Sequence, residues 1–234
     1  MRKARALELM VTLGCFAFSL NAQMLTQNIA TIKTGLRFGG GLSQFREVGD
    51  IDSVLYRKND DKLQWNTLTQ QQGGLYFSGA IEIMYWKWFG IRPEVAYATR
   101  GAKSQEEGNV QLHNIAIPVS IKLKIPRDWV VEPNIFFGPE LDILLMAYAN
   151  LAGETSELSE NHFNTLDFAL FGGGGLDVNI GNYSIIMEAK YSMGFLPTGK
   201  AKIGRTSEFT DLDAKSSSLT FILGLGYSYG NLKK

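Results

Sequence analysis

The amino-acid sequence predicts a closed, eight-stranded, antiparallel up-and-down β-barrel that crosses a membrane. Three observations predict this fold class. Segments of the chain alternate strictly between two unlike faces, the links between them are short or long in turn, and the polar faces hold small residues and charges of both signs. The 45 % hydrophobic content and the mean hydropathy of -0.05 match an ordinary globular protein. Two opposite strand faces average to the same values, so composition does not exclude a barrel.

The first segment, residues 1–22, is predicted to be a secretory signal peptide. A basic start and an apolar run over 9–20 precede Ala22, and cleavage there leaves 23–234 as one barrel domain. The run is shorter than the roughly 20 residues that a membrane-spanning helix needs. A lipid anchor at Cys15 is the alternative. The chain after cleavage has no cysteine, which excludes disulfides and a cysteine-based metal site.

Strict alternation with a period of two predicts eight strands. Near the C-terminus, for example, Leu223, Leu225 and Tyr227 share one face, while both residues between them are glycine. A change in the pattern around His113 and Asn114 indicates a β-bulge. The predicted strands cover residues 32–42, 75–85, 89–98, 115–124, 134–145, 166–180, 183–195 and 219–230.

The links between these segments predict a barrel with two unlike ends. Tight turns are predicted near residues 86–87, 126–128 and 181–182, and we expect them and the N-terminus on the periplasmic side. The longer links are 43–72, 100–109, 149–163 and 197–216.

The longest link, 43–72, is the predicted contact surface for an envelope protein partner. Its side chains are both aromatic and charged. They include Tyr56, Arg57, Lys58, Asp60, Asp61 and Trp65.

Alternation alone does not decide which face points outward, because a soluble lipocalin-like barrel places its apolar face inside. A solvated outer face would be dense in Lys, Glu and Thr, whereas the polar face here is mostly Gly, Ala and Ser with scattered charges. Those residues suit the narrow lumen of an eight-stranded barrel. We therefore expect charges that pair inside the lumen and plug it: Lys33, Arg37, Glu82, Arg92, Glu94, Lys122, Lys124, Glu140, Asp142, Asp167, Asp177, Glu188 and Lys190.

Aromatic residues gather at the end of the barrel that carries the short turns. Amphipathic rings favour the boundary between lipid and water, so they predict an interface girdle against outer-membrane lipid. Its members are Trp86, Trp88, Trp129, Tyr183, Tyr227 and Tyr229.

The sequence contains no convincing catalytic or cofactor motif. The glycine run 172–175 lacks the Lys-Ser/Thr and the helix of a phosphate-binding loop, so it reads as a place where the wall bends. The two histidines, His113 and His162, have no acid and serine placed for a hydrolase. We expect no enzyme activity, no cofactor and no metal site. With 23 basic and 23 acidic residues, we also expect no binding of nucleic acid.

Three stretches resemble those of PorT-like outer-membrane β-barrel proteins. They are IRPEVAY at 91–97 with RGAK at 100–103, LHNIAIPV at 112–119, and FGPEL at 137–141. The resemblance implies an exported outer-membrane protein of Gram-negative bacteria of the Bacteroidota kind, in a family whose members mostly have no assigned activity. The sequence departs from the usual aromatic C-terminus of such barrels, because residues 231–234 follow the last tyrosine.

Three functions therefore stay open at this point. The leading one is a non-enzymatic outer-membrane barrel with a plugged polar lumen, whose long loops contact a partner or the surroundings. The second is a narrow pore for small solutes or ions. The third is a soluble, lipocalin-like periplasmic carrier.

Overall fold

The computed structural model describes residues 31–46, 54–58, 61–64, 67–104, 108–125, 130–151, 154–158, 163–202, 209–212 and 214–229. The predicted signal peptide, His162 and Trp129 lie outside these residues. In the part of the chain so described, there is no helix that is long and apolar enough to cross a membrane.

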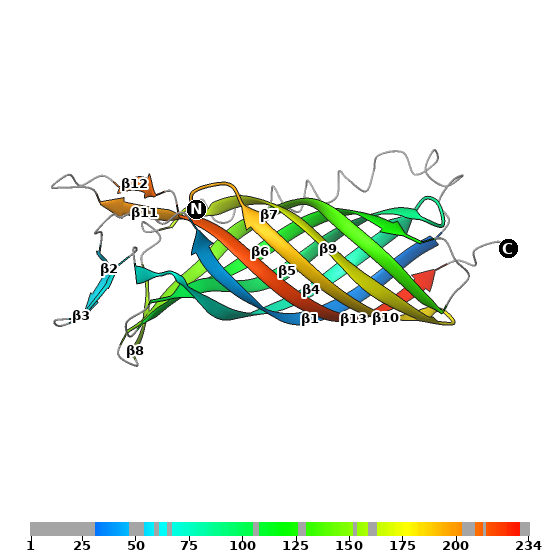
Figure 1. Cartoon of the computed structure of the whole chain (residues 1–234), viewed down its shortest axis with the longest axis horizontal. Helices are drawn as coiled ribbons and strands as arrows, with labels where there is room; N and C mark the ends of the chain where they lie inside the picture. The colour runs from blue at the N-terminus through cyan, green and yellow to red at the C-terminus, as the bar shows by residue number, and fades with distance from the viewer. Residues whose placement is uncertain are drawn as a thin grey trace, which may run out of the picture.

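Eight long antiparallel strands close into one barrel (Figure 1), as the sequence predicts. The hydrogen-bonded order is β6-β5-β4-β1-β13-β10-β9-β7, and pairing of β6 with β7 closes the ring. Neighbours in the ring follow one another along the chain, apart from the pair β1 and β13 that joins its two ends. The strands are β1 (Thr31–Arg46), β4 (Gln70–Met84), β5 (Phe89–Lys103), β6 (Asn109–Lys124), β7 (Val131–Leu151), β9 (Leu166–Ile180), β10 (Tyr183–Gly194) and β13 (Lys215–Tyr229).

The two ends of the barrel differ, as the lengths of the links predict (Figure 1). At the turn end, β4 meets β5, β6 meets β7 and β9 meets β10 through short connections. In the last of these, Gly181 has a φ of 61°, a conformation that glycine adopts without steric cost. The loop end carries the short strands β2 (Val54–Lys58), β3 (Asp61–Gln64), β8 (Glu154–Glu157), β11 (Gly199–Lys202) and β12 (Phe209–Leu212).

Most of the strands are longer than predicted, and the difference lies mainly at the loop end, whereas β9 has the predicted bounds and β10 is one residue shorter. β5 and β6 together take up half of the predicted link 100–109, and β7 runs to Leu151. The predicted link 43–72 contains the hairpin of β2 and β3, and 197–216 contains the hairpin of β11 and β12. Apolar residues at outward positions reveal the alternation, and the outward positions of β5 and β6 at the loop end, from residue 99 to residue 113, are not apolar.

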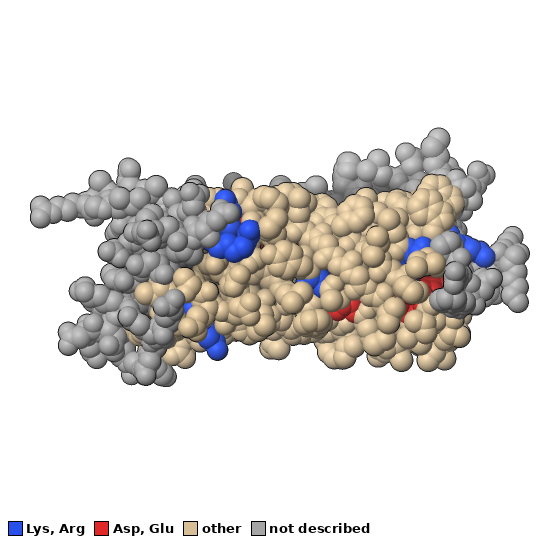
Figure 2. Space-filling view, viewed as in Figure 1, with Lys and Arg blue, Asp and Glu red and all other residues tan. Residues whose placement is uncertain are grey.

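The outward face of the barrel wall is apolar over most of its length. Large exposed side chains include Leu36, Phe77, Ile135, Phe221 and Leu225. Figure 2 shows one side of this wall, on which uncharged residues cover most of the surface between the two ends. A lipocalin-like barrel has the opposite arrangement, so the third functional hypothesis does not fit the structure.

The predicted irregularity near His113 and Asn114 is confirmed, and its extra residue lies in the adjacent strand. His113 pairs with Met146 and Asn114 with Leu144, which leaves Leu145 of β7 without a counterpart in β6. Inward positions of β7 are even-numbered before this bulge and odd-numbered after it. In β6 the alternation is unbroken, but the inward side chains change from polar to apolar.

Candidate functional site

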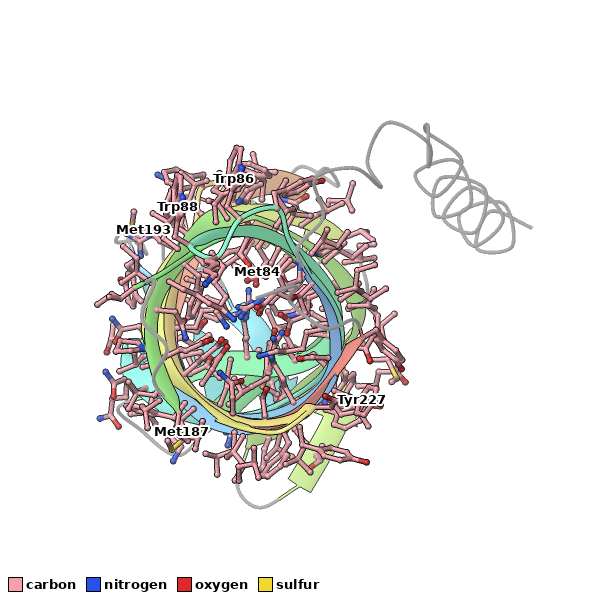
Figure 3. The ribbon with its side chains drawn as sticks, turned by 90° about the vertical axis from the view of Figure 1, so that its right-hand side faces the viewer. Met84, Trp86, Trp88, Met187, Met193 and Tyr227 are labelled. Carbon is pink, nitrogen blue, oxygen red and sulfur yellow. The ribbon has the colours of Figure 1, made fainter. Side chains whose placement is uncertain are left out.

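The candidate site is the lumen, which has two sections along the barrel axis. The polar lumen holds the thirteen residues that the sequence places inside, and all thirteen are buried. Seen from the turn end, nitrogen and oxygen atoms fill the middle of the barrel (Figure 3). Towards the loop end lies a section that we call the apolar cap: Phe45, Leu68, Ala102, Val110, Leu112, Ala147, Ala149, Leu151, Leu158, Phe163 and Ala214.

Lysines from β6 hold together the charges nearest the turn end. Lys122 Nζ lies 3.1 Å from Glu82 Oε2 and 3.0 Å from Asp177 Oδ2, while Lys124 Nζ lies 2.8 Å from Glu82 Oε1. Lys33 Nζ reaches Asp177 Oδ2 at 3.4 Å. Lys122 and Lys124 point the same way because they are two residues apart in one strand. Three ammonium groups thus share two carboxylates that are fully buried.

Two bridges cross the middle of the lumen. Arg92 Nη1 of β5 lies 2.6 Å from Glu188 Oε1 of β10, a strand on the opposite side of the ring. Arg37 Nη1 donates to Glu94 Oε2 at 2.9 Å. The Arg92 guanidinium carbon lies 4.7 Å from the centre of the Phe136 ring, a cation–π distance. These side chains bring paired charge and one aromatic ring into the middle of the lumen.

Arg100 is a lumen residue that the sequence analysis missed, because it was assigned to a loop. It is buried in β5, where Nη2 lies 2.5 Å from Glu140 Oε1 and Nη1 pairs with Asp142 Oδ2. Lys190 Nζ completes this group at 2.7 Å from Glu140 Oε2. The predicted set holds six basic residues and seven carboxylates. Arg100 raises the number of buried basic residues to seven, so the charges in the lumen are equal in number. A balanced interior is what burial of so many charges requires.

Inward aromatic residues are a second feature that alternation did not reveal. Tyr76, Phe136 and Phe171 are buried in the lumen among the charges. Tyr76 Oη donates to Glu94 Oε1 at 2.5 Å, and Lys190 Nζ lies 4.5 Å from the centre of the Tyr76 ring. Each of these aromatic residues lies an even number of residues from an inward charge of the same strand. That spacing in the sequence could have placed them inside the barrel.

The lumen cavities of the described residues are small. One of about 10 Å³ lies beside Tyr76 and Arg100, and another of about 20 Å³ lies beside Asp142 and Asp167. A cavity needs at least about 10–15 Å³ to hold one water molecule. Each therefore has room for at most about one water molecule, and not for a column of water.

Aromatic side chains surround the turn end on the outside. Trp86 stacks on Trp88 with ring centres 5.6 Å apart, and Tyr227 lies edge-on to Tyr183 at 5.2 Å. Tyr229 packs against Tyr227 and is exposed. Figure 3 shows Trp86, Trp88 and Tyr227 directed away from the barrel axis. The girdle that these residues form stays a prediction.

A methionine lies in the lumen at the turn end. Met84 points inward in Figure 3 and is buried. Its neighbour across the sheet is Gly90, a residue that leaves room for the thioether.

His113 points outward and makes no hydrolase-like contact. Its Nδ1 hydrogen-bonds the hydroxyl of Tyr97, and its ring lies edge-on to Tyr148. Within the described chain neither a serine nor a carboxylate is among its hydrogen-bond partners. Across those same residues, no group of three His, Cys, Asp or Glu side chains is placed to hold a metal ion.

The predicted partner surface is described only in its backbone. The hairpin of β2 and β3 occupies the middle of link 43–72, with Tyr56 paired to Leu63. Side-chain positions of the six residues singled out there lie outside the described part of the structure.

Comparison with known proteins identifies a family of outer-membrane barrels. The sequence pattern of the family described as outer membrane protein beta-barrel domain matches residues 20–198. A search of curated protein sequences found no match.

Solved barrels resemble the chain at low sequence identity. Neisserial surface protein A (NspA) is 12 % identical, with a TM-score of 0.44 over 86 % of this chain and 97 % of that one. OprG from Pseudomonas aeruginosa is 11 % identical, with a TM-score of 0.44 over 84 % and 96 %. Ail of Yersinia pestis, solved with the heparin analogue sucrose octasulfate, is 15 % identical, with a TM-score of 0.41 over 85 % and 99 %.

Proposed function

This chain belongs to the outer membrane protein beta-barrel domain family, and on that premise we propose that it is a non-enzymatic barrel with a plugged lumen whose loop end makes its functional contacts. The outer membrane is its location, and the apolar wall faces the hydrocarbon of the bilayer. What lies inside the wall then decides between a pore and a closed barrel.

The observation that best supports a plugged lumen is the series of side-chain obstructions along the barrel axis. An ion would meet Met84, then the lysine and carboxylate group around Lys122, then the bridge from Arg92 to Glu188, and finally the apolar cap. Paired charges cross-link opposite walls, and the cap offers no polar group to replace the hydration shell of an ion. A narrow pore, the runner-up, needs a continuous wet path.

Recording across a planar lipid bilayer separates these two functions. Purified folded protein is expected to give no steady conductance. Heat-modifiable migration of the same sample on a gel shows that the barrel is folded, so that silence cannot come from failed insertion. A steady conductance that scales with salt concentration would establish the pore and overturn the plugged lumen.

If the lumen is closed, the surfaces left for functional contacts are the wall and the two ends of the barrel, and the loop end suits such contacts best. The wall faces lipid, the turn end carries short connections, and the hairpins β2–β3 and β11–β12 extend the loop end. The 43–72 link is the first candidate for an envelope protein partner because it joins aromatic and charged residues over the greatest length. Zero formal net charge gives no support for nucleic acid as a partner.

Replacing residues 47–66 with a short Gly/Ser turn, which keeps Leu68 of the apolar cap, tests the role of this link. We expect the barrel to fold, since β1 and β4 pair directly, and we expect binding or envelope phenotypes to be lost. The matched control replaces residues 200–211, which removes the other hairpin. If the first replacement leaves every such phenotype intact, the link is not the contact surface.

Two finer predictions concern enzyme activity and the PorT-like group. The outward histidine with phenol partners supports the absence of hydrolase activity, and we retain that prediction. Membership of the PorT-like group also stays a prediction, supported by the stretches at 91–97 and 137–141.

A further inference from the structure

One buried carboxylate of the polar lumen differs from the rest. Asp167 of β9 is only 8 % exposed, and among the described residues it has no ion-pair partner, whereas each of the other six lumen carboxylates has at least one. Its Oδ2 accepts a hydrogen bond from Ser216 Oγ at 2.7 Å. Its Oδ1 has no hydrogen-bond partner within the part of the chain that the structure describes. A buried charge left in this state is costly unless something compensates it.

The uncompensated oxygens converge on one cavity. The cavity of about 20 Å³ next to the apolar cap is lined by polar and charged residues together with Leu112 and Leu144: Arg100, Asn114, Asp142, Asn164, Thr165, Asp167, Thr198 and Ser216. Asp142 Oδ1, Asp167 Oδ1 and Thr198 Oγ1 are all buried, and none of them has a hydrogen-bond partner among the described residues. Asp142 and Asp167 are direct partners in the pairing of β7 with β9, so their Cβ atoms are about 4.5–5.5 Å apart.

The local charge is also unbalanced. The charged residues that line the cavity are one cation, Arg100, and two carboxylates, Asp142 and Asp167. Arg100 pairs with Glu140 and Asp142, and Lys190 pairs with Glu140. Neither cation pairs with Asp167, so its negative charge is not balanced by an ion pair in the described part of the chain. The site therefore carries one net negative charge, although the whole lumen is balanced.

We propose that this cavity binds one hard monovalent cation, such as Na⁺, through Asp142, Asp167 and Thr198. Hard cations take oxygen ligands, and carboxylate, hydroxyl and amide oxygens line the cavity. The volume admits one ion or one water molecule. A water molecule supplies two donors and no charge, so it leaves the excess of Asp167 in place. The cation matches both the three free oxygens and the single negative charge.

The site links a loop segment to the barrel wall. Thr198 lies between β10 and β11, and its amide donates to Ala214 at 2.7 Å, while Asp142 and Asp167 belong to long strands of the wall. The bound ion would fasten the start of the β11–β12 hairpin to the mouth of the barrel. This proposal departs from the sequence-based expectation of no metal site, because no cysteine or histidine takes part and the ligands are far apart along the chain.

Unfolding in urea at constant ionic strength tests the site. For wild-type protein in detergent micelles, the unfolding midpoint is expected to rise as NaCl replaces choline chloride, since a ligand that binds only the folded state stabilises it. Asp167→Asn removes the excess charge and is expected to abolish this Na⁺-specific shift. Glu132→Gln is the matched control: it alters a partly exposed carboxylate paired with Lys124 near the turn end, and the shift should persist.

Thr198→Val keeps both carboxylates and removes one oxygen ligand, so it tests the site even if Asp167→Asn does not fold. We expect it to move the Na⁺ dependence to higher concentration. Equal responses of wild type, Asp167→Asn and Thr198→Val to Na⁺ would overturn the proposal. A shift that needs Asp167 but responds to Ca²⁺ and not to Na⁺ would overturn the assignment of a monovalent ion.

Discussion

The same strands build two regions with opposite chemistry. In the lipid-facing region of β6, Lys122 and Asn114 point inward, and Ile121 and Ile115 point outward. In the loop-end region of the same strand, Leu112 and Val110 are buried inside, and His113 and Gln111 face outward. The backbone alternation does not change between the two regions, so the reversal comes from the side chains alone.

The reversal marks the point where the wall leaves the bilayer. Between residues 115 and 125 the outward positions are apolar. At about 3.3 Å per residue and a tilt of about 40°, this stretch covers about 25 Å along the barrel axis, close to the apolar band of an outer-membrane barrel. Beyond it we expect water outside the wall, and there the inward side chains of β6 are apolar.

Removing one lysine of the polar lumen is expected to have the largest effect. Lys122→Ala leaves the buried carboxylates of Glu82, Asp177 and Glu188 with fewer cations, at a cost of about 3–5 kcal/mol in the free energy of unfolding. Urea unfolding monitored by tryptophan fluorescence measures it. Lys103→Ala, at an exposed position of β5, is the control and should change stability by no more than about 0.5 kcal/mol. Similar effects of the two changes would contradict the paired lumen.

Two phenylalanines compare the apolar cap with the lipid-facing wall. Phe163 is 1 % exposed in the cap and Phe221 is 62 % exposed on the wall. Truncation of Phe163 to Ala leaves a cavity in a packed core, with an expected cost of about 4 kcal/mol. Lipid chains fill the space left by Phe221→Ala, so only the transfer of the side chain from lipid to water is lost, about 2 kcal/mol. Equal losses in urea unfolding would show that the cap is not packed as a core.

Neighbouring glycines of β9 provide the smallest and most local comparison. A Cβ atom at Gly173 would press on the Phe136 ring and the carbonyl oxygen of Ala189, whereas one at outward Gly174 would meet nothing closer than 3.4 Å. Gly173→Ala should destabilise the barrel by about 1–2 kcal/mol, and Gly174→Ala should be close to neutral. A barrel that tolerates both substitutions equally has more space in its lumen than the structure shows.

The lipid-facing region was predictable from the sequence because alternation and charge agree there. Leu223, Leu225 and Tyr227 against their small neighbours predict strand β13 without any other information. The loop-end region was not predictable in this way. Apolar Leu112 and Ala147 point inward there, whereas in the lipid-facing region the apolar side chains point outward.

Arg100 was missed for the same reason. It follows Tyr97 by three residues, where the outward face has turned polar, so it reads as part of a loop. The convergence of Asp142, Asp167 and Thr198 on one cavity depends on the register of β7 with β9 and on the path of the chain after β10. Neither can be derived from spacing along one sequence.

The reversal along β6 is tested most directly by labelling of single cysteines with a charged, membrane-impermeant maleimide. The chain has one cysteine, Cys15, in the predicted signal peptide, so Gln111→Cys, Ile117→Cys and Leu112→Cys each add one new thiol. Gln111→Cys is expected to label rapidly in intact outer membranes, because its position faces water. Ile117→Cys in the lipid-facing wall and Leu112→Cys in the apolar cap should stay unlabelled until the protein is unfolded. Rapid labelling of Ile117→Cys in the folded protein would contradict the placement of the bilayer, and rapid labelling of Leu112→Cys would contradict the closed lumen.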